Sequence, residues 1–201
     1  YTTLFRSGGT GNTEVIWLPS NVVAYARTVD VAYNVGTYNY VTPEAGLGDV
    51  VSGTNTDTNI SQVTQNGTTS TTADIVISNN ETTSNRTATT TITYANGTVT
   101  LTINQASAPI TVSLDNTSIS TGNAVTLTVQ NSGPSTPTTI SAGSYTVGVY
   151  TDESCTTLAA DSAFTDSTSS DNKVTFSTAG TYYIKVTSGD STVISAEITV
   201  S

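Results

Sequence analysis

Threonine and apolar residues alternate through residues 81–105, and this two-residue period constrains the fold more than any other feature of the sequence. Successive side chains of an extended chain point to opposite faces. Ile92 and Tyr94 therefore share one face, whereas Thr91 and Thr93 share the other. This pattern predicts a half-buried β-strand.

A hairpin turn is predicted where this alternation pauses, at Asn96-Gly97. Both central residues of a type I′ turn need a positive φ, and Asn-Gly is the preferred pair. A two-residue loop at this point pairs Tyr94 with Val99 and Ile92 with Leu101, so both apolar faces lie on one side. A slip of one residue would separate them. We expect a β-hairpin with one buried apolar face and one polar threonine face.

The composition of the whole chain agrees with an all-β fold. Threonine makes up about a fifth of the 201 residues, and its branched side chain suits the surface of a sheet. No segment of ten residues or more has the apolar stripe of an amphipathic helix. The length suits one large or two small domains.

Small residues and a proline follow the predicted hairpin at Gln105-Ala-Ser-Ala-Pro109, and we interpret this segment as a linker. The expected organisation is an N-terminal arm or first strand over residues 1–27, one sandwich over 28–108 and another over 109–201. In the last part, strands are expected at residues 110–114, 124–130, 144–150, 173–177, 180–187 and 192–200. About seven short strands in such a length are typical of an immunoglobulin-like sandwich.

The segment VTFSTAGTYYIKV, residues 174–186, resembles the E–F region of an immunoglobulin-like domain. The resemblance puts Tyr182 in the position of the tyrosine corner. It also puts Leu127 and Ile184 where the family disulfide usually lies. We therefore expect two tandem immunoglobulin-like β-sandwiches whose stability comes from apolar cores, because Cys155 is the only cysteine.

Residues 79–107 resemble the C-terminal half of a BACON domain, an immunoglobulin-like module. The resemblance is carried by Asn80, by Asn85-Arg86, by the alternating hairpin and by Gln105. Residues 41–49, VTPEAGLGD, resemble the proline-glycine segment in the middle of that family.

The sequence departs from the BACON pattern in two places. The usual tryptophan before the proline-glycine segment is missing, and Tyr38 or Tyr40 stands there instead. Residues 50–72 form a long polar insertion. The resemblance implies a surface protein of Bacteroidota or a virion protein of crAss-like phages.

The chain lacks the residues that most catalytic sites use. The chain has no histidine and one cysteine, so serine-histidine and cysteine-histidine sites are ruled out and zinc loses its common ligands. Carboxylate pairs for glycoside hydrolysis could come from Asp49, Asp57, Asp74 or Glu81, but solvated surface charge is the favoured interpretation. We therefore expect no enzyme activity and no cofactor.

Two oxygen-rich loops, residues 53–61 and 166–172, could hold calcium, but neither has the EF-hand pattern, so polar turns are favoured and no metal site is expected. Cys155 has acidic neighbours, Asp152 and Glu153, and is expected to be inert.

The net charge of −10 would repel a polyanion, which argues against nucleic-acid binding. No apolar run is long enough to span a membrane, so no membrane insertion is expected.

A tyrosine-rich segment is the candidate ligand site. Tyr33, Tyr38 and Tyr40 lie close together in the sequence. An apolar ring face can stack on a sugar, as in host-surface or mucin glycans. The alternative interpretation is packing in the sheet and core with the hydroxyls at the rim, and it is favoured.

The N-terminal segment is the candidate docking element for a partner such as a capsid or other virion protein. Its candidate contact residues are Phe5, Arg6, Ile16, Trp17 and Leu18. The alternative is an additional first strand on the N-terminal sandwich. The first residue is Tyr1, which suggests a processed chain or a fragment.

Three functions remain open at this stage. The first is a non-catalytic structural or attachment protein on a virion surface, as an auxiliary (decoration) capsid protein or a fibre component of a Bacteroidota-infecting phage. The second is a carbohydrate-binding module on a bacterial cell surface. The third is a pilus or filament subunit joined by strand donation. All three are extracellular.

Overall fold

The computed structural model describes residues 2–5, 15–18, 23–42, 46–55, 60–65 and 71–201. In these residues the chain is all-β, and the only helical element is a single 3-10 turn, η1 (Asp161–Ala163). The strands up to the linker are β1 (Thr2–Phe5), β2 (Val15–Leu18), β3 (Val23–Val31), β4 (Gly36–Val41), β5 (Val50–Asn55), β6 (Ser61–Gln65), β7 (Thr72–Ile77), β8 (Arg86–Tyr94) and β9 (Gly97–Gln105). The predicted all-β class is confirmed.

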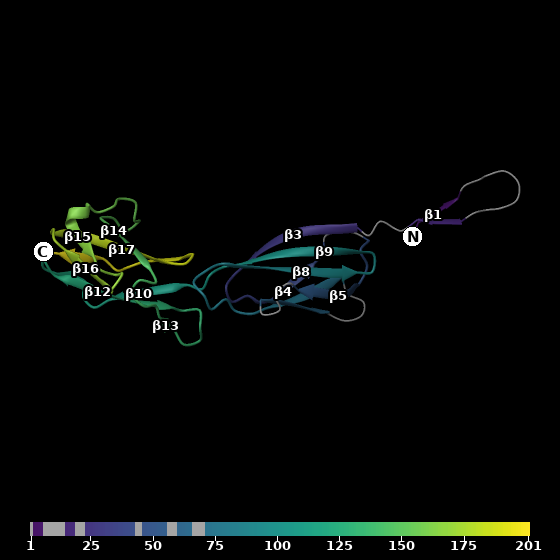
Figure 1. The fold of residues 1–201 in the computed structure, drawn as a ribbon, viewed down its shortest axis with the longest axis horizontal. Helices are drawn as coiled ribbons and strands as arrows, with labels where there is room; N and C mark the ends of the chain where they lie inside the picture. Colours follow the sequence, from purple (N-terminus) through teal and green to yellow (C-terminus); the bar gives the residue numbers. More distant parts are fainter. Residues whose placement is uncertain (1, 6–14, 19–22, 43–45, 56–59, 66–70) are drawn as a thin grey trace, which may run out of the picture. The chain divides into compact units, whose positions relative to one another are not determined.

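The first sandwich has two sheets with the strand orders β3-β9-β8-β5 and β4-β7-β6 (Figure 1). In β8 and β9, buried and half-buried side chains alternate along both strands. Ile92, Leu101 and Ile103 are fully buried. The apolar face of the predicted hairpin therefore faces the core, while its threonine face stays partly accessible.

The hairpin turn lies one residue earlier than predicted. The strands end at Tyr94 and resume at Gly97, which leaves Ala95-Asn96 as the loop. The Thr91 and Thr100 hydroxyls lie 3.2 Å apart, so Thr91 faces Thr100 and not Thr102. The register thus differs by two residues, which keeps each side chain on its predicted face.

Backbone partners outside the hairpin account for this turn. The Ala95 and Asn96 amides donate to the carbonyls of Asp49 and Leu47, both at 2.9 Å. The Asn96 side chain donates to the carbonyl of Gly46 at 3.0 Å. Residues 46–49 therefore cap the turn between β8 and β9. A prediction from local turn preferences alone does not include these bonds.

Gly97 is required for close packing. Its φ is not positive, in contrast to the type I′ prediction. A Cβ at this position would lie 2.5 Å from the Val23 carbonyl oxygen and 2.7 Å from Leu47 Cδ2. The glycine lets β3 and the residue 47 segment approach the hairpin.

The second sandwich also has two sheets. Its strands are β10 (Ile110–Leu114), β11 (Ser118–Ile119), β12 (Ala124–Asn131), β13 (Thr138–Thr139), β14 (Thr146–Tyr150), β15 (Phe164–Asp166), β16 (Lys173–Phe176), β17 (Gly180–Ser188), β18 (Ser191–Ile194) and β19 (Ile198–Val200). One sheet has the order β10-β12-β16-β15, with β13 on β12. The other has the order β11-β19-β17-β14, with β18 on β17. The short strand β11 runs parallel to β19, and all other pairs in this sandwich are antiparallel.

The predicted tyrosine corner is present. The Tyr182 hydroxyl donates to the backbone carbonyl of Thr178 at 3.1 Å, and its ring lies 4.8 Å from that of Phe176. Leu127 and Ile184, at the positions of the family disulfide, are buried in the same core. Two tandem immunoglobulin-like sandwiches are thus the fold of this chain.

The expected strand 192–200 is interrupted. It forms β18 and β19, which pair with successive parts of β17. Between them, the buried Ser195 hydroxyl accepts the Ile184 amide at 2.9 Å. The Ser195 hydroxyl thus takes the place of a backbone carbonyl in the pairing with β17. The alternation of the sequence does not predict this. The short strands β11, β13 and β15 were also not expected.

The expected domain boundaries need correction. β3 begins at Val23, so the boundary at residue 27/28 falls inside a strand. The chain separates into two compact units, and the division does not follow the linker. The second unit contains residues 29–36, 77–88 and 103–201, so the base of the first sandwich belongs to it.

Candidate binding surfaces and the buried polar network

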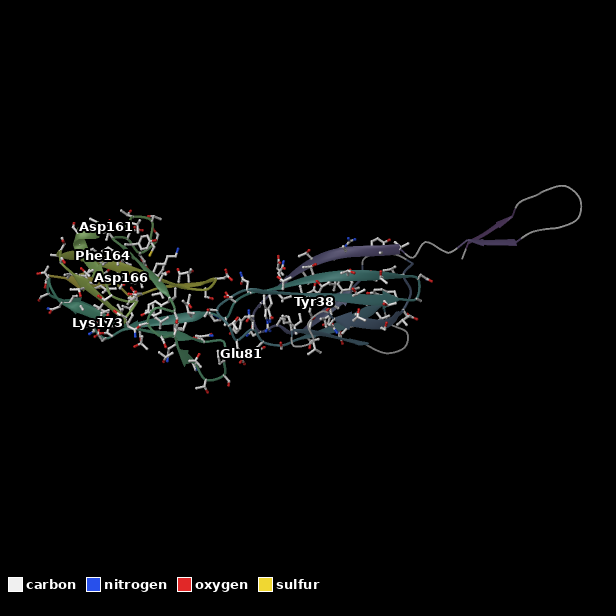
Figure 2. All side chains as sticks on the ribbon, viewed as in Figure 1. Tyr38, Glu81, Asp161, Phe164, Asp166 and Lys173 are labelled. Atoms are coloured by element: carbon white, nitrogen blue, oxygen red, sulfur yellow. The ribbon has the colours of Figure 1, made fainter. Side chains whose placement is uncertain are left out.

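The three candidate tyrosines differ in accessibility. Tyr40 is 6% exposed and belongs to the core, so its ring face is not available for stacking on a sugar. Tyr38 lies on the same strand, β4, and is half-buried (Figure 2). Tyr33 is half-buried in the turn before β4. Tyr33 belongs to the second unit, whereas Tyr38 and Tyr40 belong to the first.

The N-terminal candidates lie on a two-stranded sheet of their own. β1 pairs antiparallel with β2, with Leu4 opposite Ile16 and Phe5 opposite Val15. Trp17 and Leu18 follow on β2. Arg6 lies outside the described residues. The segment therefore forms a hairpin, and both of its strands pair with each other in the described part of the chain.

The carboxylates considered for catalysis lie on different parts of the chain: Asp49 precedes β5, Asp74 is on β7 and Glu81 follows β7. In the described ranges, no group of three or more His, Cys, Asp or Glu residues could hold a metal ion. Asp74 accepts a hydrogen bond from the Asn39 side chain on neighbouring strand β4. Glu81 is exposed, and Asp57 lies outside the described residues.

The oxygen-rich loop 166–172 uses its oxygens internally. Asp166 Oδ1 accepts the Thr168 amide at 2.8 Å and its hydroxyl at 2.6 Å. Asn172 Oδ1 accepts the Tyr145 hydroxyl at 2.8 Å. Burial raises the pKa of Tyr145, and the charges of Asp166 and Asp171 add to the shift. These bonds support the polar-turn interpretation; the other loop, 53–61, is only partly described.

Cys155 sits in a tight turn with a φ of 52°. Burial raises the pKa of its thiol, and the negative charge of Asp152 raises it further. The Asp152 carboxylate accepts the Ser154 hydroxyl at 2.5 Å and the Thr157 amide at 2.6 Å, and such bonds lower the pKa of Asp152. A thiol in this setting is a weak nucleophile at neutral pH.

A buried polar network gives a structural role to residues that the sequence analysis singled out only as a motif. Gln105 is 1% exposed at the end of β9. Its side-chain amide donates to the carbonyls of Tyr33 at 2.8 Å and Ser78 at 2.9 Å. Its oxygen accepts Arg86 Nε at 2.7 Å. One glutamine thus ties together three segments that are distant in sequence.

Arg86 extends this network. Its guanidinium also donates to the Ser78 carbonyl at 2.7 Å and to the Ser78 hydroxyl at 3.1 Å. Hydrogen bonds from a charged donor are stronger than neutral ones, so Arg86 strengthens the link between Gln105 and Ser78.

Asn80, fully buried, holds the following loop. Its side-chain amide donates to the carbonyls of Ser84 at 2.8 Å and Ala106 at 2.9 Å. Its oxygen accepts the Thr82 hydroxyl at 2.8 Å and the Thr82 amide at 3.1 Å. All polar atoms of this side chain are therefore satisfied, as a buried amide requires.

Asn85 completes the motif, since its side-chain oxygen accepts the Ser107 amide at 2.8 Å. The motif residues Asn80, Asn85, Arg86 and Gln105 therefore close the base of the first sandwich. The sequence signal for this role was a set of amides and one arginine at strand ends. The backbone carbonyls that they bind carry no sequence signal.

The surface of the described residues has several shallow grooves, and two of them are of similar size. One, of about 410 Å³, is lined by Asp30, Arg86 and Asn104 among others, and Asn104 donates to Asp30 at 2.9 Å. The other, also about 410 Å³, is lined by Tyr183 and Glu197 among others. The Tyr183 hydroxyl donates to Glu197 at 2.7 Å, and this bond, with burial, raises the pKa of Tyr183 to about 12. Both grooves are open, and the Asn104–Asp30 and Tyr183–Glu197 hydrogen bonds lie within them.

Among the described residues, no helix is long and apolar enough to cross a membrane.

No protein family model matches the chain, and no curated protein sequence matches it. Solved structures with similar folds include the adhesin InvE of Yersinia pseudotuberculosis, with 15% identity over 86% of this chain and 56% of that one, at a TM-score of 0.40. Drosophila OTK extracellular domains 3–5 match with 11% identity over 87% of this chain and 58% of that one, at 0.47. Murine CEACAM1b matches with 15% identity over 86% and 94%, at 0.40. The chain spans less than two thirds of the first two structures. Structural similarity at these identities and TM-scores does not indicate a function.

Proposed function

We propose that this chain is a non-catalytic structural or attachment protein of an extracellular surface. The observation that carries the proposal is the internal use of its polar groups. Gln105 and Asn80 satisfy backbone carbonyls of their own unit, and Asp166 caps its own loop. Residues of this kind build a rigid, low-charge module for display rather than a reactive site.

Within that class, we favour display on a virion, as an auxiliary capsid protein or fibre component of a Bacteroidota-infecting phage. The support is the sequence resemblance to the BACON family, whose motif residues Asn80, Asn85, Arg86 and Gln105 all form hydrogen bonds within one unit of this chain. The hairpin β1–β2, with Phe5 and Trp17, is the proposed docking element for a capsid or other virion protein.

Quantitative mass spectrometry of purified virions and of host outer-membrane fractions tests this proposal. Enrichment in virions at high copy supports a capsid decoration protein, and enrichment at low copy supports a fibre part. Absence from particles of the source phage rejects the virion proposal. It leaves the broader proposal of a surface structural protein standing.

A cell-surface glycan-binding module is the second candidate, and the partial exposure of Tyr38 is the observation in its favour. A glycan or mucin array with the folded chain tests it, using Tyr38→Ala and, as a matched control on the second sandwich, Tyr183→Ala. Binding that Tyr38→Ala abolishes and Tyr183→Ala leaves intact would support it. No binding by the folded protein would reject it.

Strand donation between subunits has less support. Each sandwich builds both of its sheets from strands of the same chain in its described part. A protein that stays monomeric at high concentration in analytical ultracentrifugation would argue against a pilus or filament subunit.

A further inference from the structure

The turn that joins β17 to β18, residues 188–191, makes an unusual set of contacts within the second unit. We call it the hairpin tip. The Asp190 amide donates to the Thr83 carbonyl at 2.8 Å. In return, the Asn85 amide donates to Asp190 Oδ2 at 2.8 Å. Asp190 thus forms two reciprocal hydrogen bonds with residues 83–85, more than 100 positions earlier in the chain.

The serines that flank this turn add further bonds. The Ser191 hydroxyl lies 2.5 Å from the Ala108 carbonyl oxygen and 2.8 Å from the Ser107 hydroxyl. The Ser188 and Thr83 hydroxyls lie 3.3 Å apart. Ser188 and Ser191 are 5% and 8% exposed, so both hydroxyls are largely buried, although their partners Thr83 and Ser107 are half-buried. A buried hydroxyl without a partner would cost free energy, which makes the contact specific.

Gly189 lets the backbones meet. A Cβ at Gly189 would lie 2.5 Å from the Thr83 carbonyl oxygen, and φ at this residue is +57°. Any other residue would push the Thr83 segment away.

A second contact lies at the end of β12. Asn131, 8% exposed, donates from its side chain to the Glu81 carbonyl at 2.8 Å and accepts the Gly133 amide at 2.9 Å. A Cβ at Gly133 would lie 2.4 Å from Ala108 Cβ. Two separate turns of the second sandwich, residues 131–133 and 188–191, therefore contact residues 81–85 and 107–108.

We propose that the hairpin tip is a latch that makes residues 77–88 and 103–201 one rigid body. The linker is then held by hydrogen bonds on both sides and does not act as a flexible tether. The Asn80 and Gln105 side chains add further bonds within the same unit, to the carbonyls of Ala106 and Ser78. The inference does not depend on which surface displays the protein.

Amide hydrogen exchange of the full chain, measured by NMR, tests the latch. The Asn85 and Asp190 amides should be protected in the unmodified protein. Asp190→Ala removes the acceptor and should speed exchange at Asn85 by roughly tenfold. Asp190→Asn keeps an acceptor oxygen and should retain most of the protection.

Asp115→Ala is the matched control. Asp115 also accepts a backbone amide, that of Thr126 at 2.8 Å, but within the second sandwich. It should speed exchange at Thr126 and leave Asn85 unchanged. Residual dipolar couplings from residues 77–88 and 110–201 should fit one alignment tensor. Exchange at Asn85 as fast as in an exposed loop, or a need for two tensors, would overturn the latch.

Discussion

The two sandwiches differ in the chemistry that closes them. The second closes its core with aromatic rings: Phe176 packs on Tyr182, whose hydroxyl caps a backbone carbonyl four residues upstream. The first closes its base with amides and a guanidinium, from Asn80, Gln105 and Arg86. An apolar contact tolerates small shifts in partner position, whereas a buried hydrogen bond does not. The polar base therefore specifies a geometry, and the aromatic core mainly supplies stability.

The largest effect is expected from Phe176→Ala. The side chain is fully buried in the second sandwich, and its loss leaves a cavity. Loss of about 3–5 kcal/mol in the free energy of unfolding is expected, measured by urea denaturation. Phe164→Ala, at a half-buried ring on the neighbouring strand β15, is the comparison and should cost less. Equal costs would contradict the assignment of Phe176 to the centre of the core.

Gln105→Ala should come next, and it tests the polar base. The carbonyls of Tyr33 and Ser78 would each lose one of their donors, and Arg86 Nε would lose its acceptor. A cost of about 2 kcal/mol is expected, because three hydrogen bonds are lost, one of them from a charged donor.

Gln130→Ala is the control for that change, since Gln130 is a half-buried glutamine of the second sandwich. Gln130→Ala should cost less than half as much free energy of unfolding as Gln105→Ala when both variants are measured by differential scanning calorimetry. If Gln105→Leu is as stable as the unmodified protein, the Gln105 hydrogen bonds fix the positions of their partners but do not add to the free energy of unfolding.

Gly97→Ala should destabilise the first sandwich by about 1–3 kcal/mol, because the added methyl group overlaps the Val23 carbonyl and Leu47. Gly122→Ala offers a contrast in the second sandwich. Its φ is +84° and its surroundings are open, so its cost of about 1–2 kcal/mol would come from the backbone alone. Thermal melts of both variants separate the two mechanisms. A neutral Gly97→Ala would mean that β3 yields to the methyl group.

Tyr182→Phe should cost about 1 kcal/mol, since it removes one hydrogen bond and keeps the ring. Tyr183 is the next residue and lies on the opposite face of the strand. Tyr183→Phe should leave the free energy of unfolding nearly unchanged, because the hydrogen bond to Glu197 is exposed. A larger loss for Tyr183→Phe in urea denaturation would reverse the expected order.

The smallest effect is a dependence of stability on pH from Asp115. The backbone amide of Thr126 is the main cause that lowers the pKa of this carboxyl. A lowered folded-state pKa means that its stabilisation is present above the ordinary value of 3.8 and is lost as the pH falls through the folded-state pKa. Asp115→Asn should therefore flatten the melting temperature against pH below about 4. An unchanged profile would contradict this assignment.

The sequence by itself determined the features that depend on period and on local chemistry. Alternation placed Ile92, Leu101 and Ile103 on the buried face, and the resemblance of residues 174–186 to an immunoglobulin-like E–F region implied that Tyr182 is the tyrosine corner. The Asn96-Gly97 dipeptide also indicated the hairpin, although not its exact loop. These properties depend on residues a few positions apart in the chain, so the amino-acid sequence is sufficient to predict them.

Only the tertiary structure decided how distant backbone groups are paired. The hairpin loop is Ala95-Asn96 because the carbonyls of Asp49 and Leu47 accept its amides. Tyr40 is a core residue because its strand packs inward at that point. Asp190 reaches residues 83–85 across more than a hundred positions. Every residue carries the same backbone donor and acceptor, so the sequence contains no signal for which of them meet.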